Sequence, residues 1–341
     1  MKFCRVIIIA ALSASLCAEC VRQARPVMEG YAPRYFTIPD SCTAIILSPY
    51  SENADTLVVD RPFKRIVCMS GSYVGYLSAI GRSDAVCAVS GARFISDSTV
   101  AAGFAGGTVR EAGYEGAVDY EAILASRPDL VVTYGVSSAV PQYVSRLRGL
   151  GMKVLLLSEH LECHPLARAG YVRLFGFLTG CADKGDSVYS AVRDNYLSRC
   201  RKPSGIKVLM NIPYSGKWFV PGRESYMSRL IEDAGGEILG VREGTSASGV
   251  ITMEEAFGYA AQADFWLHAG ACTQKKQVLS SHPFLGNFPE IPLYNNNLRM
   301  TPGGGNDYWE SGAVRPDLVL EDIEAIFDGD TSAVMTYYRR L

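Results

Sequence analysis

Short apolar runs alternate with helix-patterned segments through most of the chain. In the first half, strands are predicted over 65–69, 85–89, 130–133 and 154–157, and helices over 70–80, 119–126 and 140–150. Gly and Pro residues mark the short connections between them. Strands that alternate with helices in this way indicate a mostly parallel sheet. We therefore predict an α/β lobe over residues 62–182.

A long helix separates this segment from a second alternation. Val188, Tyr189, Val192 and Tyr196 fall at helical spacing, so we predict a bridging helix over 183–202 that is about 27 Å long. Further strands are predicted over 207–211, 264–269 and 291–294, and further helices over 225–234, 253–261 and 317–327. The predicted fold class is α/β, with two Rossmann-like lobes of parallel sheets joined by one long helix. The second lobe covers 203–341.

The first twenty residues have the order of a bacterial export signal. Lys2 and Arg5 precede the uncharged run 6–16, which is shorter than the roughly 20 residues of a membrane span. We predict an export signal over 1–20 and a periplasmic location. Cys20 is the predicted lipidation site, with Cys17 or simple cleavage of the signal as alternatives, because neither cysteine follows a small residue. Residues 21–61 form a predicted extension with a hairpin at 43–48 and 56–59.

The composition narrows the classes of function. The chain has 48% hydrophobic and 20% charged residues and a net charge of −2, which excludes disorder and disfavours a nucleic-acid partner. The cysteines after residue 20 show no CxxC pair, so we interpret them mostly as buried small hydrophobic residues, with one disulfide left open. Pro165 follows His164, which favours loop histidines at 160 and 164 over a helical metal pair. Because the chain has only four histidines and lacks GxGxxG, GxxxxGK[ST] and GxSxG, we predict no metal site, cofactor or catalytic residue.

Several motifs carry a resemblance to a known family. They are the segments 119–124 (DYEAIL), 127–132 (RPDLVV), 150–154 (LGMKV) and, more loosely, 252–256 (TMEEA). With them, residues 62–327 resemble the iron-siderophore and cobalamin substrate-binding proteins of ABC importers, which have two lobes joined by one helix. The resemblance implies a monomeric, non-enzymatic protein that binds a ferric siderophore or similar iron chelate and delivers it to an ABC permease.

The resemblance also implies one permease-docking carboxylate on each lobe. These fall on Glu121 and Glu254, with Glu255 as the alternative if the register differs by one. Two separated carboxylates on rigid lobes can fix the orientation in which the protein docks on a basic partner. The competing interpretation is that both glutamates only stabilise helix N-termini.

Ligand-contacting residues in this fold lie on the loops that follow the strands. The residues expected to bind the ligand are Ser72, Tyr73, Arg93, Phe94, Tyr134, Trp218, Arg223 and Trp309. Aromatic rings offer rigid contact area, and arginines suit an anionic chelate. Cobalamin is the close alternative ligand, and haem is third because no His or Tyr is tied to an axial position. An exported chelatase or hydrolase, and a surface lipoprotein that serves an outer-membrane transporter, remain as other functions.

Overall fold

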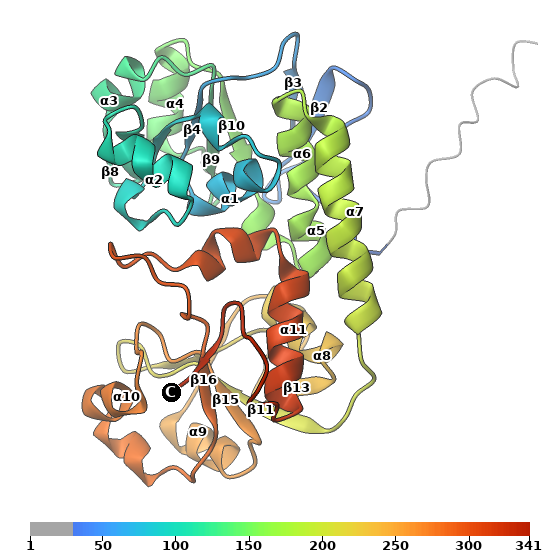
Figure 1. The fold of residues 1–341 in the computed structure, drawn as a ribbon, viewed down its shortest axis with the longest axis vertical. Coiled ribbons are helices and arrows are strands. Elements are labelled where there is room, and N and C mark those ends of the chain that lie inside the picture. The colour runs from blue at the N-terminus through green and yellow to red at the C-terminus, as the bar shows by residue number, and fades with distance from the viewer. Residues whose placement is uncertain (1–29) are drawn as a thin grey trace, which may run out of the picture.

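The computed structural model describes residues 30–341 of the chain (Figure 1). The predicted export signal over 1–20 and the lipidation site at Cys20 lie outside the described residues. Within residues 30–341, no helix combines the length and the apolar composition that a membrane crossing requires.

The first lobe is built on a five-stranded parallel sheet in the order β10-β9-β4-β5-β6. Its strands are β4 (Ile66–Cys68), β5 (Val86–Val89), β6 (Arg110–Glu111), β9 (Leu130–Tyr134) and β10 (Val154–Leu157), and a small hairpin pairs β7 (Gly113–Tyr114) with β8 (Ala117–Val118). Its helices are α1 (Gly71–Ala79), α2 (Ser98–Ala105), α3 (Tyr120–Ala125), α4 (Gln142–Gly149), α5 (Pro165–Ala169) and α6 (Tyr171–Leu178).

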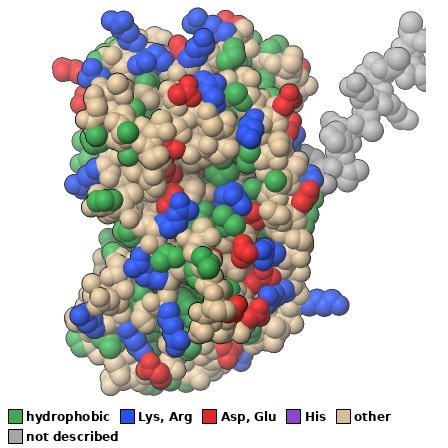
Figure 2. Space-filling model, in the orientation of Figure 1, with side chains coloured by type: hydrophobic (Ala, Val, Ile, Leu, Met, Phe, Trp, Pro, Cys, Tyr) green, Lys and Arg blue, Asp and Glu red, His purple; other side chains and the backbone are tan. Residues whose placement is uncertain are grey.

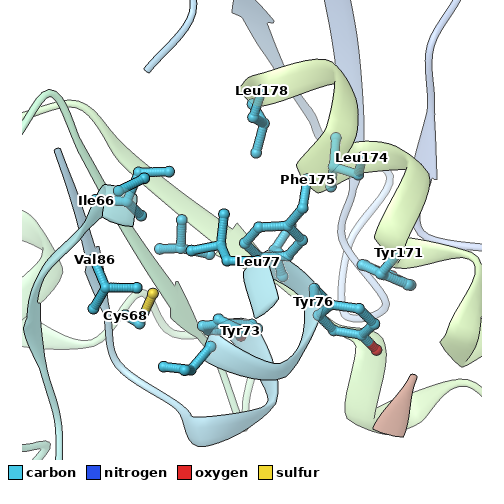
Figure 3. Close-up of a cluster of buried hydrophobic side chains, with 14 of the residues drawn as sticks. Ile66, Cys68, Tyr73, Tyr76, Leu77, Val86, Tyr171, Leu174, Phe175 and Leu178 are labelled. Atoms are coloured by element: carbon cyan, nitrogen blue, oxygen red, sulfur yellow. The ribbon is translucent and has the colours of Figure 1, made fainter. Parts of the chain in front are cut away.

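Side chains alternate along these strands between two apolar layers. Leu130 and Val132 belong to the cluster that packs against α1 and α6, part of which is drawn in Figure 3. Val131, between them, packs with Val144 and Leu147 of α4 in a separate cluster. Helices therefore cover both faces of the sheet, as a buried parallel sheet requires.

The second lobe repeats this arrangement with the strand order β13-β11-β15-β16-β17. Its strands are β11 (Ile206–Met210), β13 (Gly236–Ile238), β15 (Phe265–Leu267), β16 (Leu293–Asn295) and the antiparallel β17 (Arg339–Arg340), beside a hairpin of β12 (Trp218–Val220) and β14 (Gly249–Ile251). Its helices are α8 (Tyr226–Asp233), α9 (Met253–Ala260), α10 (Lys275–Ser281) and α11 (Pro316–Phe327). The predicted α/β fold class with two parallel-sheet lobes is confirmed.

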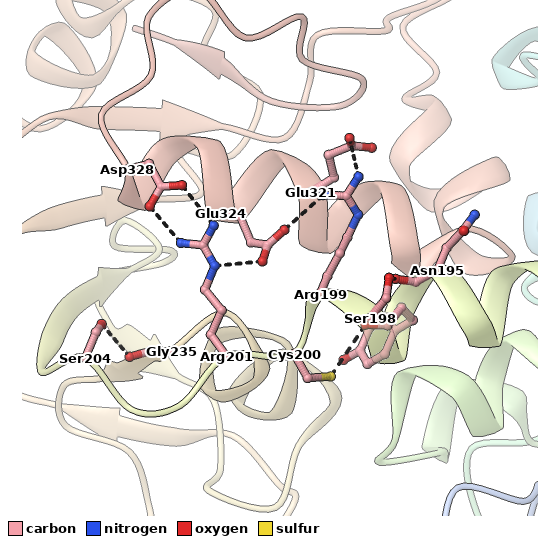
Figure 4. A network of polar contacts seen from close by, with 11 residues as sticks. Asn195, Ser198, Arg199, Cys200, Arg201, Ser204, Gly235, Glu321, Glu324 and Asp328 are labelled. Atoms are coloured by element: carbon pink, nitrogen blue, oxygen red, sulfur yellow. Dashed lines mark hydrogen bonds and ion pairs between the residues drawn. The ribbon is translucent and has the colours of Figure 1, made fainter.

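Helix α7 (Ala182–Arg199) lies between the two sheets in the chain and packs against α6 and α11. An ion-pair network fastens its C-terminal end to α11 (Figure 4). Arg199 contacts Glu321 and Glu324, and Arg201 contacts Glu324 and Asp328. The side chain of Glu324 is only 8% exposed and is shared by both arginines, so the network holds α7 and α11 in register.

The chain also crosses between the lobes a second time, which the hydrophobic pattern did not predict. Residues 296–315, hereafter the crossing segment, leave β16 and pack against α1 of the first lobe before α11 begins (Figure 1). The carboxylate of Glu310 accepts hydrogen bonds from the backbone N–H groups of Ser96 and Asp97, at 2.7 and 2.8 Å. A Cβ atom on Gly75 would lie 2.3 Å from the carbonyl oxygen of Glu310, so this close packing requires glycine there.

The N-terminal extension forms an antiparallel sheet of β1 (Phe36–Thr37), β2 (Thr43–Leu47) and β3 (Ala54–Val58), so the predicted hairpin is confirmed. It is fixed to the first lobe by Phe36, whose ring centroid lies 4.8 Å from that of Tyr171.

The interpretation of the cysteines as mostly buried is wrong. Only Cys68 and Cys87 are buried, whereas Cys42 and Cys200 are exposed, and none of the cysteines of residues 30–341 forms a disulfide. Cysteine is often buried, but Cys42 lies in a bend before β2 and Cys200 directly follows the last residue of α7, so both side chains reach the surface.

Candidate functional site

A cavity of about 860 Å³ lies at the carboxyl edge of the first sheet. Ser70 follows β4, Ser90 follows β5, Tyr134 ends β9 and Glu159 follows β10, and all four line the cavity. The sheet order changes direction at β4, because β5 lies on one side of it and β9 on the other. The space outside such a switch point is where open α/β sheets bind ligands. Figure 2 shows an indentation between the lobes with Lys and Arg side chains on both rims.

Large aromatic side chains are exposed along this cavity. Phe94 is 41% exposed, Tyr114 68% and Trp309 58%, and the half-buried Tyr134 lies beside them. Trp309 comes from the crossing segment, so the wall combines two distant parts of the chain. Exposed aromatic residues gathered in a hollow are typical of a ligand site. The structure thus brings together Ser72, Arg93, Phe94, Tyr134 and Trp309 of the predicted residues.

Two glycines of the crossing segment make this wall possible. A Cβ on Gly303 would lie 2.0 Å from the carbonyl oxygen of Arg93, and one on Gly305 would lie 1.7 Å from that of Phe94. The guanidinium carbon of Arg93 in turn lies 4.3 Å from the centroid of the Phe94 ring. The Gly-rich sequence 302–305 is therefore a backbone contact that holds the loop bearing both residues.

The carboxylates that line the cavity already have hydrogen-bond donors. Glu159 accepts from the hydroxyl groups of Ser72 and Tyr73, at 3.0 and 3.2 Å. Glu111 accepts from the backbone N–H groups of residues 91, 92 and 113. Burial opposes the charge of Glu159, but its hydrogen bond to His160 and the charge of Arg168 bring the pKa of this carboxyl below its usual value.

Two arginines also line the cavity, and they differ in their surroundings. Arg93 is exposed beside the Phe94 ring, whereas Arg168 shares a side-chain hydrogen bond with Tyr76, interacts with the charge of Glu159 and has its Nε buried without a hydrogen-bond partner. The guanidinium carbon of Arg168 lies 5.5 Å from the ring centroid of Tyr226 in the second lobe. Sequence reasoning missed Arg168 because it lies on helix α5 and not on a loop that follows a strand.

An imidazole and a phenol meet at the same cavity. His160 and Tyr134 both line it, and their ring centroids are 5.9 Å apart. His164 has a structural role instead, because its Nδ1 accepts a hydrogen bond from the backbone N–H of Leu166 at the start of α5. Burial lowers the pKa of His164 to about 4. Within the described part of the chain, no group of three or more His, Cys, Asp or Glu side chains is arranged to hold a metal ion.

Three predicted ligand residues do not line the cavity. Trp218 is completely buried in the core of the second lobe, where it stacks on Trp266 at 6.1 Å, so its assignment to the ligand site is corrected. Tyr73 is also completely buried, and its hydroxyl group donates a hydrogen bond to the carboxylate of Glu159. Arg223 is held by Glu232 and Glu243 and therefore has its own partners.

The candidate docking carboxylates are exposed at the first turns of two helices. Glu121 lies at the start of α3 in the first lobe, and Glu254 at the start of α9 in the second (Figure 1). The alternative Glu255 is engaged in a capping box, in which its carboxylate accepts from the backbone N–H of Thr252 at 2.7 Å. Because Glu255 is used within its own helix, Glu254 is the carboxylate of this pair that is free for a partner.

A second cavity, of about 660 Å³, lies between α1, α7 and the crossing segment. Its charged side chains are already satisfied. Arg299 pairs with Asp307 at 3.0 Å, and Glu310 accepts the two backbone hydrogen bonds described above. It also lacks the exposed aromatic wall of the first cavity, so the larger cavity is the better candidate for a ligand site.

Comparison with known proteins agrees with this geometry. The family model described as "Periplasmic binding protein" matches residues 66–289. An uncharacterized lipoprotein of Methanocaldococcus jannaschii is 22% identical over 79% of this chain, which spans 66% of that relative's length.

Solved structures share the fold. A periplasmic haem-binding protein from Pseudomonas aeruginosa matches with a TM-score of 0.59 and 17% identity, over 82% of this chain and 98% of that protein. An ABC-type Fe³⁺-hydroxamate transport protein from Saccharomonospora viridis matches with a TM-score of 0.54 and 17% identity, over 80% and 96%.

Proposed function

The chain belongs to the periplasmic binding protein family, and on that premise we propose that it is the substrate-binding component of an ABC importer for an iron chelate such as a ferric siderophore. The exposed aromatic wall of Phe94, Tyr114 and Trp309 is the observation that carries the proposal. Flat, rigid rings that are exposed in a cavity suit a bulky ligand that covers them on binding. Cobalamin is the alternative ligand with the same requirement.

Haem is the second candidate, and a specific observation favours it. Tyr134 and His160 lie together at the cavity, and both are residue types that bind haem iron. The sequence alone tied neither side chain to an axial position, because the turn that carries His160 is not adjacent to β9 in the chain.

In the proposed mechanism the protein captures its ligand at the edge of the first sheet and delivers it to a permease. Glu121 and Glu254 are the proposed docking groups, one on each lobe, and their exposure and free carboxylates support this role. The protein acts outside the inner membrane as a monomer, anchored at Cys20 or released after cleavage of its signal. No chemical change of the ligand is part of this proposal.

Tryptophan fluorescence can test the proposal, because only one tryptophan faces the cavity. Trp218 and Trp266 are 0% and 3% exposed in the second-lobe core, whereas Trp309 is 58% exposed at the cavity. Titration with a ferric tricatecholate, a ferric trihydroxamate, haem and cobalamin should quench Trp309 with at least one of them. A Trp309→Phe variant should lose that quenching. Isothermal titration calorimetry should independently detect binding of the same ligand by the wild type.

The same experiment separates a binding protein from an enzyme. Chromatography of the bound ligand after release should return it chemically unchanged, whereas a chelatase would return free metal and a hydrolase a cleaved ligand. If no ligand of the panel binds the wild type, the proposed function is refuted while the fold is unaffected.

A further inference from the structure

The helices that carry the two candidate docking carboxylates share an exposed pattern. In α3 of the first lobe, Leu124 follows Glu121 by three residues and is 45% exposed. In α9 of the second lobe, Phe257 follows Glu254 by three residues and is 46% exposed. The Phe257 ring is held by an edge-on contact with Phe288, at 5.5 Å between the ring centroids. Residues three apart are neighbours on one side of a helix, so each carboxylate stands beside a large apolar side chain that is half open to water.

The next position on the same side of each helix is small. Ala125 and Gly258 come four residues after the glutamates, and both are exposed. No atom lies within 4 Å of a Cβ built on Gly258. Ile123 and Ala256, which directly precede the apolar residues, are completely buried and fix each helix to its lobe. The same order of acidic, apolar and small exposed positions thus occurs once on each lobe.

The two glutamates are not used to cap their helices. In α3 the side chain of Asp119 accepts a hydrogen bond from the backbone N–H of Ala122 at 2.8 Å, and in α9 the capping box described above satisfies the first turn. Among residues 30–341, the carboxylates of Glu121 and Glu254 have no hydrogen-bonded or ion-paired partner. Both charges are therefore open to a partner from outside the chain.

The topology places these helices at corresponding positions of the two lobes. Helix α3 leads into β9 and helix α9 into β15, and each of these strands lies between two parallel neighbours. A helix that connects parallel strands runs in the opposite direction to them, so it begins at their carboxyl edge. In the first lobe this is the edge at which the cavity lies. Each glutamate, in the first turn of its helix, therefore lies at the carboxyl edge of its own sheet.

Carboxylates alone are weak docking groups. An exposed ion pair contributes little to affinity because water screens both charges, and most of the affinity of an interface comes from a few side chains that are fully buried in it. We propose that each lobe docks on the permease through a composite face, in which the glutamate pairs with a basic side chain and the neighbouring leucine or phenylalanine is buried in an apolar pocket. The two docking faces are Glu121, Leu124 and Ala125 on α3 and Glu254, Phe257 and Gly258 on α9. The proposal names the partner surface of the proposed function and rests on it.

Shortening the apolar side chains tests this inference and leaves the carboxylates in place. Purified protein, loaded with the ligand of the panel that it binds, is added to spheroplasts of cells that lack it, and ligand uptake is measured against protein concentration. Leu124→Ala and Phe257→Ala should each raise the protein concentration for half-maximal uptake about 3- to 10-fold, because about half of a large apolar side chain is no longer buried on docking. The dissociation constant of the ligand should not change. The control Leu197→Ala, at a leucine of α7 that is 42% exposed, should leave the half-maximal concentration unchanged.

Two further readouts separate the apolar contact from the ion pair and from folding. The difference between wild type and either alanine variant should persist as salt is raised, because salt screens charge pairs and not apolar contacts. Gly258→Gln fills the small position of the second face and replaces a glycine inside a helix. Its melting temperature should therefore rise while its half-maximal concentration also rises, since glutamine favours the helix and its side chain keeps the partner away. A variant that is more stable and docks less well does not owe its defect to misfolding.

The outcomes separate this inference from the proposed function. If the wild type supports uptake and any one of Leu124→Ala, Phe257→Ala or Gly258→Gln does so at the same protein concentration, the composite faces are overturned and the proposed function stands. A changed dissociation constant of the ligand in these variants would place the side chains in ligand binding and would also overturn the inference. If the wild type binds no ligand of the panel, or binds one without supporting its uptake, the proposed function fails and the inference fails with it.

Discussion

Replacing Gly305 with alanine tests whether the crossing segment builds the ligand site. The Cβ of an alanine at this position would lie 1.7 Å from the carbonyl oxygen of Phe94. Ordinary Cβ contacts begin at 3.4 Å, so the two backbones must separate by roughly 1.7 Å. The turn itself cannot absorb this shift, because the backbone N–H and C=O of Gly305 are both bonded to Thr301.

The size of the effect follows from this geometry. Overpacking of a well-packed contact typically costs about 1–3 kcal/mol, so the free energy of unfolding of Gly305→Ala should fall by about that amount. The displaced loop also carries Arg93 and Phe94, so ligand affinity should fall as well. The φ angle of Gly305 is not in the left-handed region, so backbone strain adds nothing and the steric overlap is tested by itself.

Chemical denaturation and calorimetric titration with the ligand of the wild type give the two readouts. Gly286→Ala is the matched control, because no atom lies within 4 Å of the Cβ that it would add. If Gly305→Ala matches the wild type in both stability and affinity, the crossing segment does not hold the ligand wall and the reasoning is refuted.

Three further variants, two single and one double, test other parts of the molecule. Burial raises the pKa of Glu310 to about 7, so the folded protein holds a proton that the unfolded chain releases above about pH 4.5. Stability from this group is therefore lost as the pH rises through 7. Between pH 4.5 and 8, the free energy of unfolding of the wild type should fall relative to that of Glu310→Gln. The same pH dependence in both proteins would contradict the burial argument. Glu324→Gln should lower the free energy of unfolding by about 1–3 kcal/mol, measured by denaturant titration, because two arginines share this carboxylate; no change would show that the network in Figure 4 does not stabilise the α7–α11 contact. Replacing both Glu121 and Glu254 with arginine should abolish ligand uptake by cells and leave the dissociation constant of the ligand unchanged. The control Glu52→Arg, at an exposed carboxylate of the hairpin, should have no effect on uptake. Normal uptake by the double variant would rule out the docking role.

The sequence predicts the regular elements well because their signals are local. The predicted strands and helices agree with the structure to within about two residues at their ends, since apolar runs and Gly or Pro stops coincide there, except that α7 ends at Arg199 and not at residue 202. Helices α2, α5, α6 and α10 were not predicted; they are short, with at most eight residues each, and most of α6 (Tyr171–Leu178) is buried.

The ligand site was predicted only in part because it depends on long-range contacts. The loops after β4, β5 and β9 supplied Ser72, Arg93, Phe94 and Tyr134 by the rule that strand ends line the site. The same rule failed for Trp218, since β12 folds back against β14 and turns the indole into the core. No local pattern distinguishes an aromatic residue that faces a ligand from one that stacks on another ring.

A structure of the protein with its bound chelate tests the proposed ligand site most directly. We predict the ligand between Phe94, Tyr134 and Trp309. A ligand bound in the cavity between α1, α7 and the crossing segment, or one that leaves the aromatic wall uncovered, would contradict the proposed site.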